Sequence, residues 1–130
     1  MSSTMAKSSA RPKHLNLLQI RLPVPGIVSI LHRVSGAILF LMLPLLLWLL
    51  QSSLRSPESF AAFQGFMGNP LVKLLLLGLF WGYVHHLLAG VRHLFLDLHM
   101  GTELETARAS SMVVLAAGIV LTLLLGLRLW

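Results

Sequence analysis

The stretch that decides the fold is IVSILHRVSGAILFLMLPLLLWLL, residues 27–50. It is apolar except for a few polar side chains gathered in its first third. At 1.5 Å per residue, a helix of this length measures about 36 Å, enough to cross a hydrocarbon core of roughly 30 Å. We therefore expect a transmembrane helix here, kinked at Pro44, since membrane helices tolerate an internal proline.

Two further apolar segments follow along the chain. Residues 71–96 predict a second transmembrane helix, with Lys73 snorkelling from its near end. Residues 111–127 predict a third helix, with Arg128 and Trp130 as interfacial anchors. The expected fold class is therefore an all-α membrane protein with three transmembrane helices.

The composition of the whole chain supports this assignment. Of the 130 residues, 56% are hydrophobic and only 11% are charged, with a mean hydropathy of +0.83. A soluble domain of this size cannot bury so much apolar surface, and soluble chains carry roughly a quarter charged residues. These values exclude a disordered chain, a nucleic-acid module and an ordinary cytosolic enzyme. The chain has no cysteine, which excludes disulfides, thiolate metal sites and an iron–sulfur cluster of its own.

Charge predicts the orientation in the membrane. Residues 1–26 lack the pattern of a cleaved signal peptide, so we expect them to be retained as a basic cytoplasmic segment. Residues 51–69 are then expected as a loop on the opposite side, partly lying in the interface. Residues 98–110 return to the cytoplasm as a short polar loop, and residues 27–130 form the membrane anchor domain. The N-terminal segment holds four cations and no acid: Lys7, Arg11, Lys13 and Arg21.

A stripe of small residues marks one face of the second predicted helix. Gly78, Gly82, His86 and Gly90 recur every four residues and so share a face. Such a face lets a flat macrocycle approach while Nε2 of His86 ligates its iron, which makes His86 the candidate haem ligand. The alternative is a GxxxG-like helix contact, with His86 only hydrogen-bonding a neighbouring helix. His85 lies about 100° away and is expected to face a neighbouring subunit or lipid headgroups, but spacing alone leaves the choice of ligand between the two histidines open.

Polar residues gather at the same membrane side of the first two helices. Arg92 and His93 are candidates to hold haem propionates, and the alternative is that they snorkel and pair with Asp97. Ser29 and Arg33 are one turn apart on the first helix, where they could bind a quinone carbonyl entering from the lipid. The alternative makes Arg33 only a membrane anchor.

Motifs of independent catalysis do not occur in the sequence. It contains no GxGxxG, Walker A, HExxH or Ser-His-Asp pattern, and its four acids offer no convincing acid pair within the membrane. The chain therefore has the features of a cofactor-bearing subunit of a larger assembly.

Two segments resemble a known family. RPKHLNLLQIRLPVPGIVSILHRVSG, residues 11–36, and HHLLAGVRHLFLDLHMG, residues 85–101, are similar to the larger cytochrome b membrane-anchor subunit of succinate dehydrogenase, respiratory complex II. The motifs that carry the resemblance are RPxxL, SxLHRxSG and HxxxGxRHLxxD, in this order. The resemblance implies three transmembrane helices that form half of a heterodimeric anchor bundle. A second small anchor subunit forms the other half, and one haem b lies between them.

The same motifs imply residue roles. The position four residues before Gly90 in HxxxGxRHLxxD implies that His86 is the axial haem ligand, whereas His85 falls outside the motif. SxLHRxSG implies that Ser29 and Arg33 bind ubiquinone and that His32 and Arg33 lie near the haem propionates. The second axial histidine would come from the other anchor subunit.

At the level of the assembly, the resemblance implies a subunit of succinate:quinone oxidoreductase in the bacterial cytoplasmic (inner) membrane. A flavoprotein subunit and an iron–sulfur subunit would deliver electrons from succinate to ubiquinone, linking the tricarboxylic acid cycle to electron transport. This chain would not catalyse alone, and its contacts would be with lipid and these subunits rather than nucleic acid. The alternatives are a fumarate reductase or menaquinone-linked anchor subunit, or a non-redox three-helix scaffold.

Overall fold

The computed structural model describes residues 20–130, and in this range it forms four α-helices. Their bounds are α1 Val24–Arg55, α2 Pro57–Met67, α3 Pro70–Asp97 and α4 Leu104–Leu129. The predictions made for Lys7, Arg11 and Lys13 lie outside the described residues.

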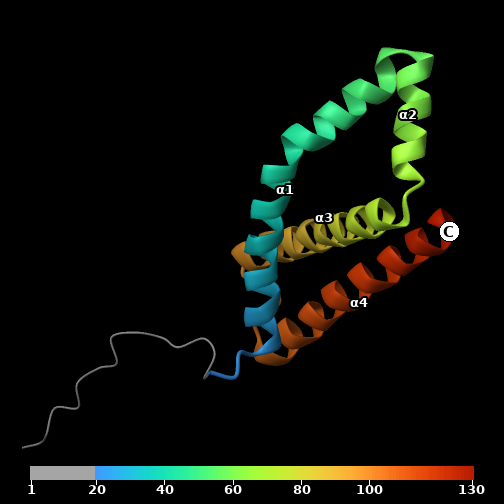
Figure 1. Cartoon of the computed structure of the whole chain (residues 1–130). Helices are drawn as coiled ribbons and strands as arrows, with labels where there is room; N and C mark the ends of the chain where they lie inside the picture. Colours follow the sequence, from blue (N-terminus) through green and yellow to red (C-terminus); the bar gives the residue numbers. More distant parts are fainter. Residues whose placement is uncertain (1–19) are drawn as a thin grey trace, which may run out of the picture.

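Helices α1, α3 and α4 are long and apolar enough to cross a membrane. This confirms the predicted all-α membrane fold with three transmembrane helices. Helix α1 remains one helix through Pro44, and its ribbon bends near the middle (Figure 1). Both ends of α1 extend beyond the predicted residues 27–50, by three residues at the start and five at the end.

The prediction of a loop over residues 51–69 is wrong, because residues 51–55 complete α1 and most of the remainder forms α2. The Ser56 hydroxyl accepts the backbone N–H of Ser59 at 3.1 Å, and Oγ of Ser59 accepts the backbone N–H of Ser56 at 2.9 Å. This reciprocal capping box satisfies two of the free donors at the helix start. Pro57 follows at the first helical position, where its fixed φ favours a helix and its missing N–H costs nothing.

The prediction of a loop over residues 98–110 is also wrong, because α4 already begins at Leu104. The chain reverses within residues 98–103, where His99 and Gly101 adopt φ values of 59° and 73°. Residues 104–110, LETARAS, are polar but rich in helix-forming Leu, Glu, Ala and Arg. Glu105 lies in the first turn, where its negative charge interacts favourably with the positive end of the helix dipole. Polarity here marks the membrane boundary and does not end the helix.

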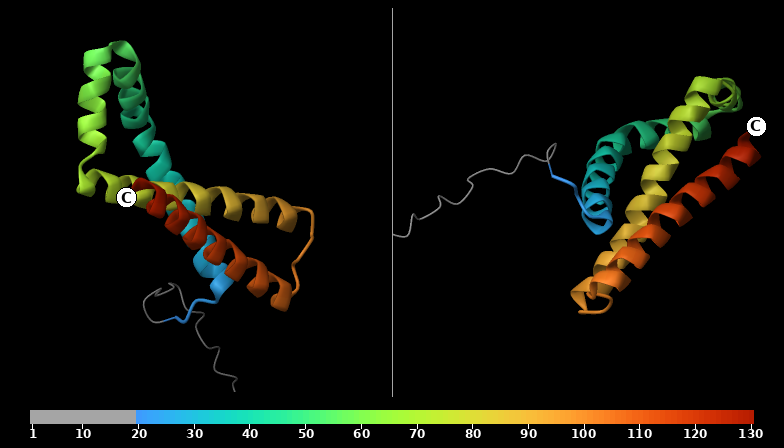
Figure 2. Two further views of the ribbon diagram at one scale, coloured as in Figure 1. Left: turned by 90° about the vertical axis from the view of Figure 1, so that its right-hand side faces the viewer. Right: turned by 90° about the horizontal axis from the view of Figure 1, so that it is seen from below.

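Helices α3 and α4 lie side by side as an antiparallel pair, and the first half of α1 packs across them (Figures 1 and 2). The second half of α1 diverges from this pair and returns to it through α2. The buried core lies where the three long helices meet, at Val28, Ala89 and Val114. The N-terminal half of α1 is thereby fixed against the middle of α3.

Lys73, expected to snorkel from the near end of the second helix, joins the start of α3 to the end of α4. Its Nζ donates a hydrogen bond to the Leu129 carbonyl at 2.8 Å. The same atom lies 5.4 Å from the centre of the Trp130 ring, a cation–π distance. The chain thus closes the open end of the α3–α4 pair.

Candidate functional site

His86 projects from α3 toward α1 and is half-buried between them. Its Nδ1 lies 3.0 Å from the backbone carbonyl of His32 and 3.3 Å from Oγ of Ser35. The Ser35 hydroxyl donates its own hydrogen to the same carbonyl at 3.0 Å. A carbonyl can only accept, so Nδ1 of His86 carries the hydrogen and donates it.

This tautomer leaves the lone pair of a neutral imidazole on Nε2 of His86. Among residues 20–130, the hydrogen bonds of the His86 side chain all involve Nδ1. Metal-bound histidines commonly donate their second ring N–H to a carbonyl, which fixes the ring orientation and raises its basicity. The geometry therefore fits a histidine that offers one lone pair to an iron.

Two more histidines lie beside His86. The His32 ring stacks on the His86 ring, with centroids 4.2 Å apart and planes 7° from parallel. The His93 ring lies 4.9 Å from His32 at 51°. Helices α1 and α3 thus bring three of the predicted site residues into one cluster, which we call the histidine cluster: His32, His86 and His93.

Two glycines make room for this cluster. A Cβ on Gly36 would lie 2.7 Å from Cε1 of His86, closer than real contacts allow. A Cβ on Gly90 would lie 3.4 Å from Nε2 of His32. Gly36 therefore requires glycine, because an imidazole from the facing helix lies too close for a side chain, whereas a Cβ at Gly90 would be at ordinary contact distance.

The glycine stripe of α3 serves more than one contact. Gly82 packs against α1, where its Cβ would lie 3.9 Å from that of Ser35, which matches the helix-contact interpretation. A Cβ on Gly78 would meet nothing within 4 Å, so this part of the stripe is open. The helix-contact interpretation therefore describes Gly82 but not Gly78.

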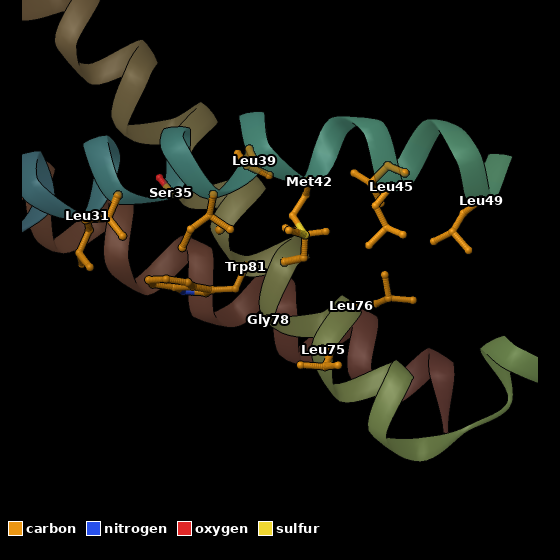
Figure 3. Close-up of a pocket in the computed structure, with 15 residues that line it drawn as sticks. Leu31, Ser35, Leu39, Met42, Leu45, Leu49, Leu75, Leu76, Gly78 and Trp81 are labelled. Atoms are coloured by element: carbon orange, nitrogen blue, oxygen red, sulfur yellow. The ribbon is translucent and has the colours of Figure 1, made fainter. Parts of the chain in front are cut away.

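An apolar cavity of about 390 Å³ opens next to the cluster, between α1 and α3. Figure 3 shows side chains from both helices pointing into it, with Ser35 and Trp81 toward one end. Ser35 also contacts Nδ1 of His86, so the cavity and the histidine cluster share a wall. A flat apolar group with a polar edge matches such a lining.

Arg92 takes a different direction from the histidine cluster. Its Nε donates to Oγ of Ser110 at 3.0 Å and one Nη donates to the carbonyl of Ala107 at 3.3 Å, both on α4. Asp97, its predicted alternative partner, is exposed at the end of α3. The residues predicted to lie near haem propionates therefore fall in two places. His32 and His93 lie between α1 and α3, and Arg92 lies between α3 and α4.

The predicted quinone residues lie one turn apart on α1. Ser29 is half-buried and Arg33 is exposed. In the described part of the chain, no hydrogen bond from either side chain is found. Within residues 20–130, neither side chain is thus held by a hydrogen bond to another residue.

The expectation that His85 faces a subunit or lipid is wrong, because its side chain is fully buried within the chain. Its ring stacks on Trp81 at 5.2 Å, and neither ring nitrogen has a hydrogen-bond partner among residues 20–130. An imidazole enclosed in this way has no open direction for a large ligand. Trp81, one turn before His85, was the sequence signal that this side of the helix is packed.

In residues 20–130, no group of three or more His, Asp or Glu side chains is arranged to hold a metal ion. The lone pair on Nε2 of His86 would suit an iron that a cofactor brings with its own ligands.

Comparison with known proteins adds a second line of support. Residues 7–125 match the family described as succinate dehydrogenase/fumarate reductase transmembrane subunit. The chain is 38% identical over 114 residues to the succinate dehydrogenase cytochrome b556 subunit of Paracoccus denitrificans, which covers 88% of each chain. It is 34% identical over 124 residues to the subunit of the same name from Coxiella burnetii, covering 95% of this chain and 99% of the relative. A third such subunit, from Rickettsia felis, is 30% identical over 115 residues, or 88% of this chain and 90% of the relative.

Proposed function

Because the chain belongs to the family of succinate dehydrogenase/fumarate reductase transmembrane subunits, we propose that it is the cytochrome b membrane anchor of a succinate:quinone oxidoreductase. It is a multi-pass membrane protein, and the relatives named above are cytochrome b556 subunits of succinate dehydrogenase. In the proposal it binds haem b together with a second small anchor subunit and forms part of the site that reduces ubiquinone. A flavoprotein subunit and an iron–sulfur subunit complete the enzyme.

The observation that carries the proposal is the orientation of His86. The His32 carbonyl and Ser35 hold its Nδ1–H, so Nε2 of His86 would hold the iron of a bound haem. Haem, when bound, supplies a one-electron redox centre within the membrane. Within this chain, His32 and His93 provide polar groups near that position. The arrangement favours a cofactor site over a scaffold whose histidines only join helices.

Ser29 and Arg33 are proposed to bind the quinone headgroup at the first turns of α1. The hydroxyl of Ser29 donates a hydrogen bond to one quinone carbonyl. The guanidinium of Arg33 stabilises the negative charge that grows on the ring oxygens as electrons arrive, an effect that is strong in a poorly solvated pocket. Two electrons and two protons convert ubiquinone to ubiquinol.

The proposed location is the bacterial cytoplasmic (inner) membrane, with the N-terminus in the cytoplasm. Residues 1–26 carry only positive charges, which favours the cytoplasmic side. In this orientation the starts of α1 and α4 and the end of α3 share the cytoplasmic side. The quinone residues then lie close to soluble subunits bound on that side, which shortens the path for electrons and protons.

The reduced-minus-oxidised optical spectrum of the purified complex tests the haem assignment. We expect His86→Ala to abolish the six-coordinate low-spin b-type spectrum, while the flavin content shows that the complex still assembles. His99→Ala is the matched control, since His99 is exposed in the α3–α4 connection. An unchanged low-spin spectrum in His86→Ala would remove His86 as the ligand, and the lack of any haem in the wild-type complex would favour the scaffold alternative.

A further inference from the structure

Arg92 is a buried cation whose hydrogen-bond partners in the described residues are neutral. Its side chain is only 8% exposed, and it bonds to the hydroxyl of Ser110 and the carbonyl of Ala107. A buried charge in a membrane protein is costly unless an anion compensates it. Helix α3 therefore holds a positive charge that still needs a counter-ion.

The guanidinium also retains free donors. Arginine has five N–H groups, and the two hydrogen bonds to α4 engage Nε and one Nη. In residues 20–130, the only fully enclosed side-chain nitrogen or oxygen atoms without a hydrogen-bond partner are the ring nitrogens of His85. The second Nη of Arg92, which has no partner there either, is therefore in contact with open space.

Arg92 also lines a groove of about 450 Å³ between α3 and α4. Most of its lining is apolar, from Leu88, Val91, Phe95 and Val113 among others. The polar side chains in its lining are Arg92, Thr106 and Ser110. The groove is thus almost wholly apolar, with one cationic side chain, Arg92, in its wall.

We propose that this groove is a binding site for one anionic phospholipid. Its phosphate accepts hydrogen bonds from the free Nη of Arg92, and an acyl chain lies along the apolar lining between α3 and α4. Arginine suits a phosphate because its planar fork of donors can make charge-assisted, bidentate hydrogen bonds. Basic pockets between transmembrane helices are known to recognise anionic lipid headgroups.

A lipid phosphate fits better than the two other anions that could be considered. A haem propionate would come from the histidine cluster between α1 and α3, whereas Arg92 points to α4. A soluble phosphate would compensate the charge but would leave the apolar lining of the groove without a partner. The lipid satisfies the charge and the apolar surface at once.

The test is native mass spectrometry of the whole purified complex, delipidated and titrated with dioleoylphosphatidylglycerol or with zwitterionic dioleoylphosphatidylcholine. We expect one tightly held phosphatidylglycerol and at least about tenfold weaker binding in Arg92→Gln, the size of one lost charge-assisted hydrogen bond. Arg92→Lys keeps the charge and should retain much of the binding. Arg108→Gln is the matched control, because it removes an exposed cation at the same end of the bundle.

A second variant tests the groove without changing Arg92. Val113→Trp places a large side chain in the exposed lining, so we expect it to displace the lipid while the haem spectrum stays unchanged. Equal phosphatidylglycerol binding in wild type, Arg92→Gln and Val113→Trp would overturn the proposal. Full competition by inorganic phosphate would also overturn it, because the site would then bind a soluble anion. So would a changed haem spectrum in Arg92→Gln without lipid loss, which would make Arg92 a propionate contact.

Discussion

The contact between Gly36 and His86 shows how single residues set the geometry of the site. The absence of a side chain at Gly36 allows the imidazole to sit against α1, where the His32 carbonyl takes its N–H. The orientation of the His86 ring therefore depends on Gly36, a residue that makes no polar contact with it. This dependence gives a direct mutational test.

We predict that Gly36→Ala disturbs the haem site while the chain still inserts. The new Cβ would lie 2.7 Å from Cε1 of His86, whereas ordinary contact begins at 3.4 Å, so the ring must move by about 0.7 Å (3.4 − 2.7). Overpacking of this kind costs about 1–3 kcal/mol. The low-spin haem spectrum should shift or be lost. Gly65→Ala in α2 is the control, since nothing lies within 4 Å of its added Cβ, and a normal spectrum in both variants would contradict the prediction.

The quinone residues allow quinone chemistry to be separated from haem binding. Ser29 and Arg33 lie on α1, whereas the proposed ligand lies on α3. Ser29→Ala should lower quinone reduction while succinate oxidation with a soluble artificial acceptor and the haem spectrum remain nearly intact. Arg33→Leu should be more severe, because losing a charged donor costs more than losing a neutral one.

The measurement is the ratio of quinone-linked to artificial-acceptor activity, normalised to assembled flavin. Phe40→Leu is a suitable control, since this exposed α1 side chain lies about two turns beyond Arg33. A normal ratio in both Ser29→Ala and Arg33→Leu would place the quinone elsewhere and leave Arg33 as an anchor or a haem contact.

Sequence reasoning identified the residues of the histidine cluster but not the directions of all their neighbours. A four-residue repeat locates a face of α3, which is why His86 and the glycines could be grouped in advance. Which helix lies against each face is a tertiary property. Arg92 and His85 therefore could not be placed from α3 alone, and their contacts with α4 and Trp81 appear only in the folded chain.

At the level of elements, the long apolar helices were predictable and the polar segments between them were not. Hydropathy indicates whether a segment lies in lipid or in water. The backbone conformation of residues 51–69 depends instead on local capping. Ser56 and Pro57 lie within the segment predicted as a loop, yet they cap and begin α2. Residues 104–110 show the same limit, because a helix that leaves the membrane becomes polar without ending.

We predict that Ser56→Ala weakens α2 without affecting the haem. The substitution removes the side-chain acceptor of the Ser59 N–H, and loss of an N-cap typically costs about 0.5–2 kcal/mol. Faster amide hydrogen exchange should appear in the first turn of α2. Ser53→Ala is the control, since the Ser53 hydroxyl donates a hydrogen bond to the Leu50 carbonyl within α1 and caps no helix. Unchanged exchange in Ser56→Ala would mean that packing rather than the cap holds α2.

For the whole molecule, the chain covers little of its own apolar surface. Large side chains such as Phe40 and Leu127 are 72% and 79% exposed, and the buried core is confined to the crossing of the three long helices. Exposed apolar surface of this extent requires lipid or another subunit. The composition alone predicted this environment, because no folded arrangement of so few polar residues could cover the chain.

The orientation in the membrane is the last prediction, and because this chain has no cysteine, any label on it must come from an introduced one. The basic residues before α1 favour a cytoplasmic N-terminus, so α2 should face the opposite side and the α3–α4 connection the cytoplasm. Gln64 in α2 and Thr102 in the connection are both exposed and suit single cysteine substitutions. With an impermeant thiol reagent, Gln64→Cys should react in right-side-out vesicles and Thr102→Cys only in inside-out vesicles or after detergent. The inverse pattern would reverse the orientation and move the proposed quinone site to the outer side, where soluble subunits in the cytoplasm could not reach it.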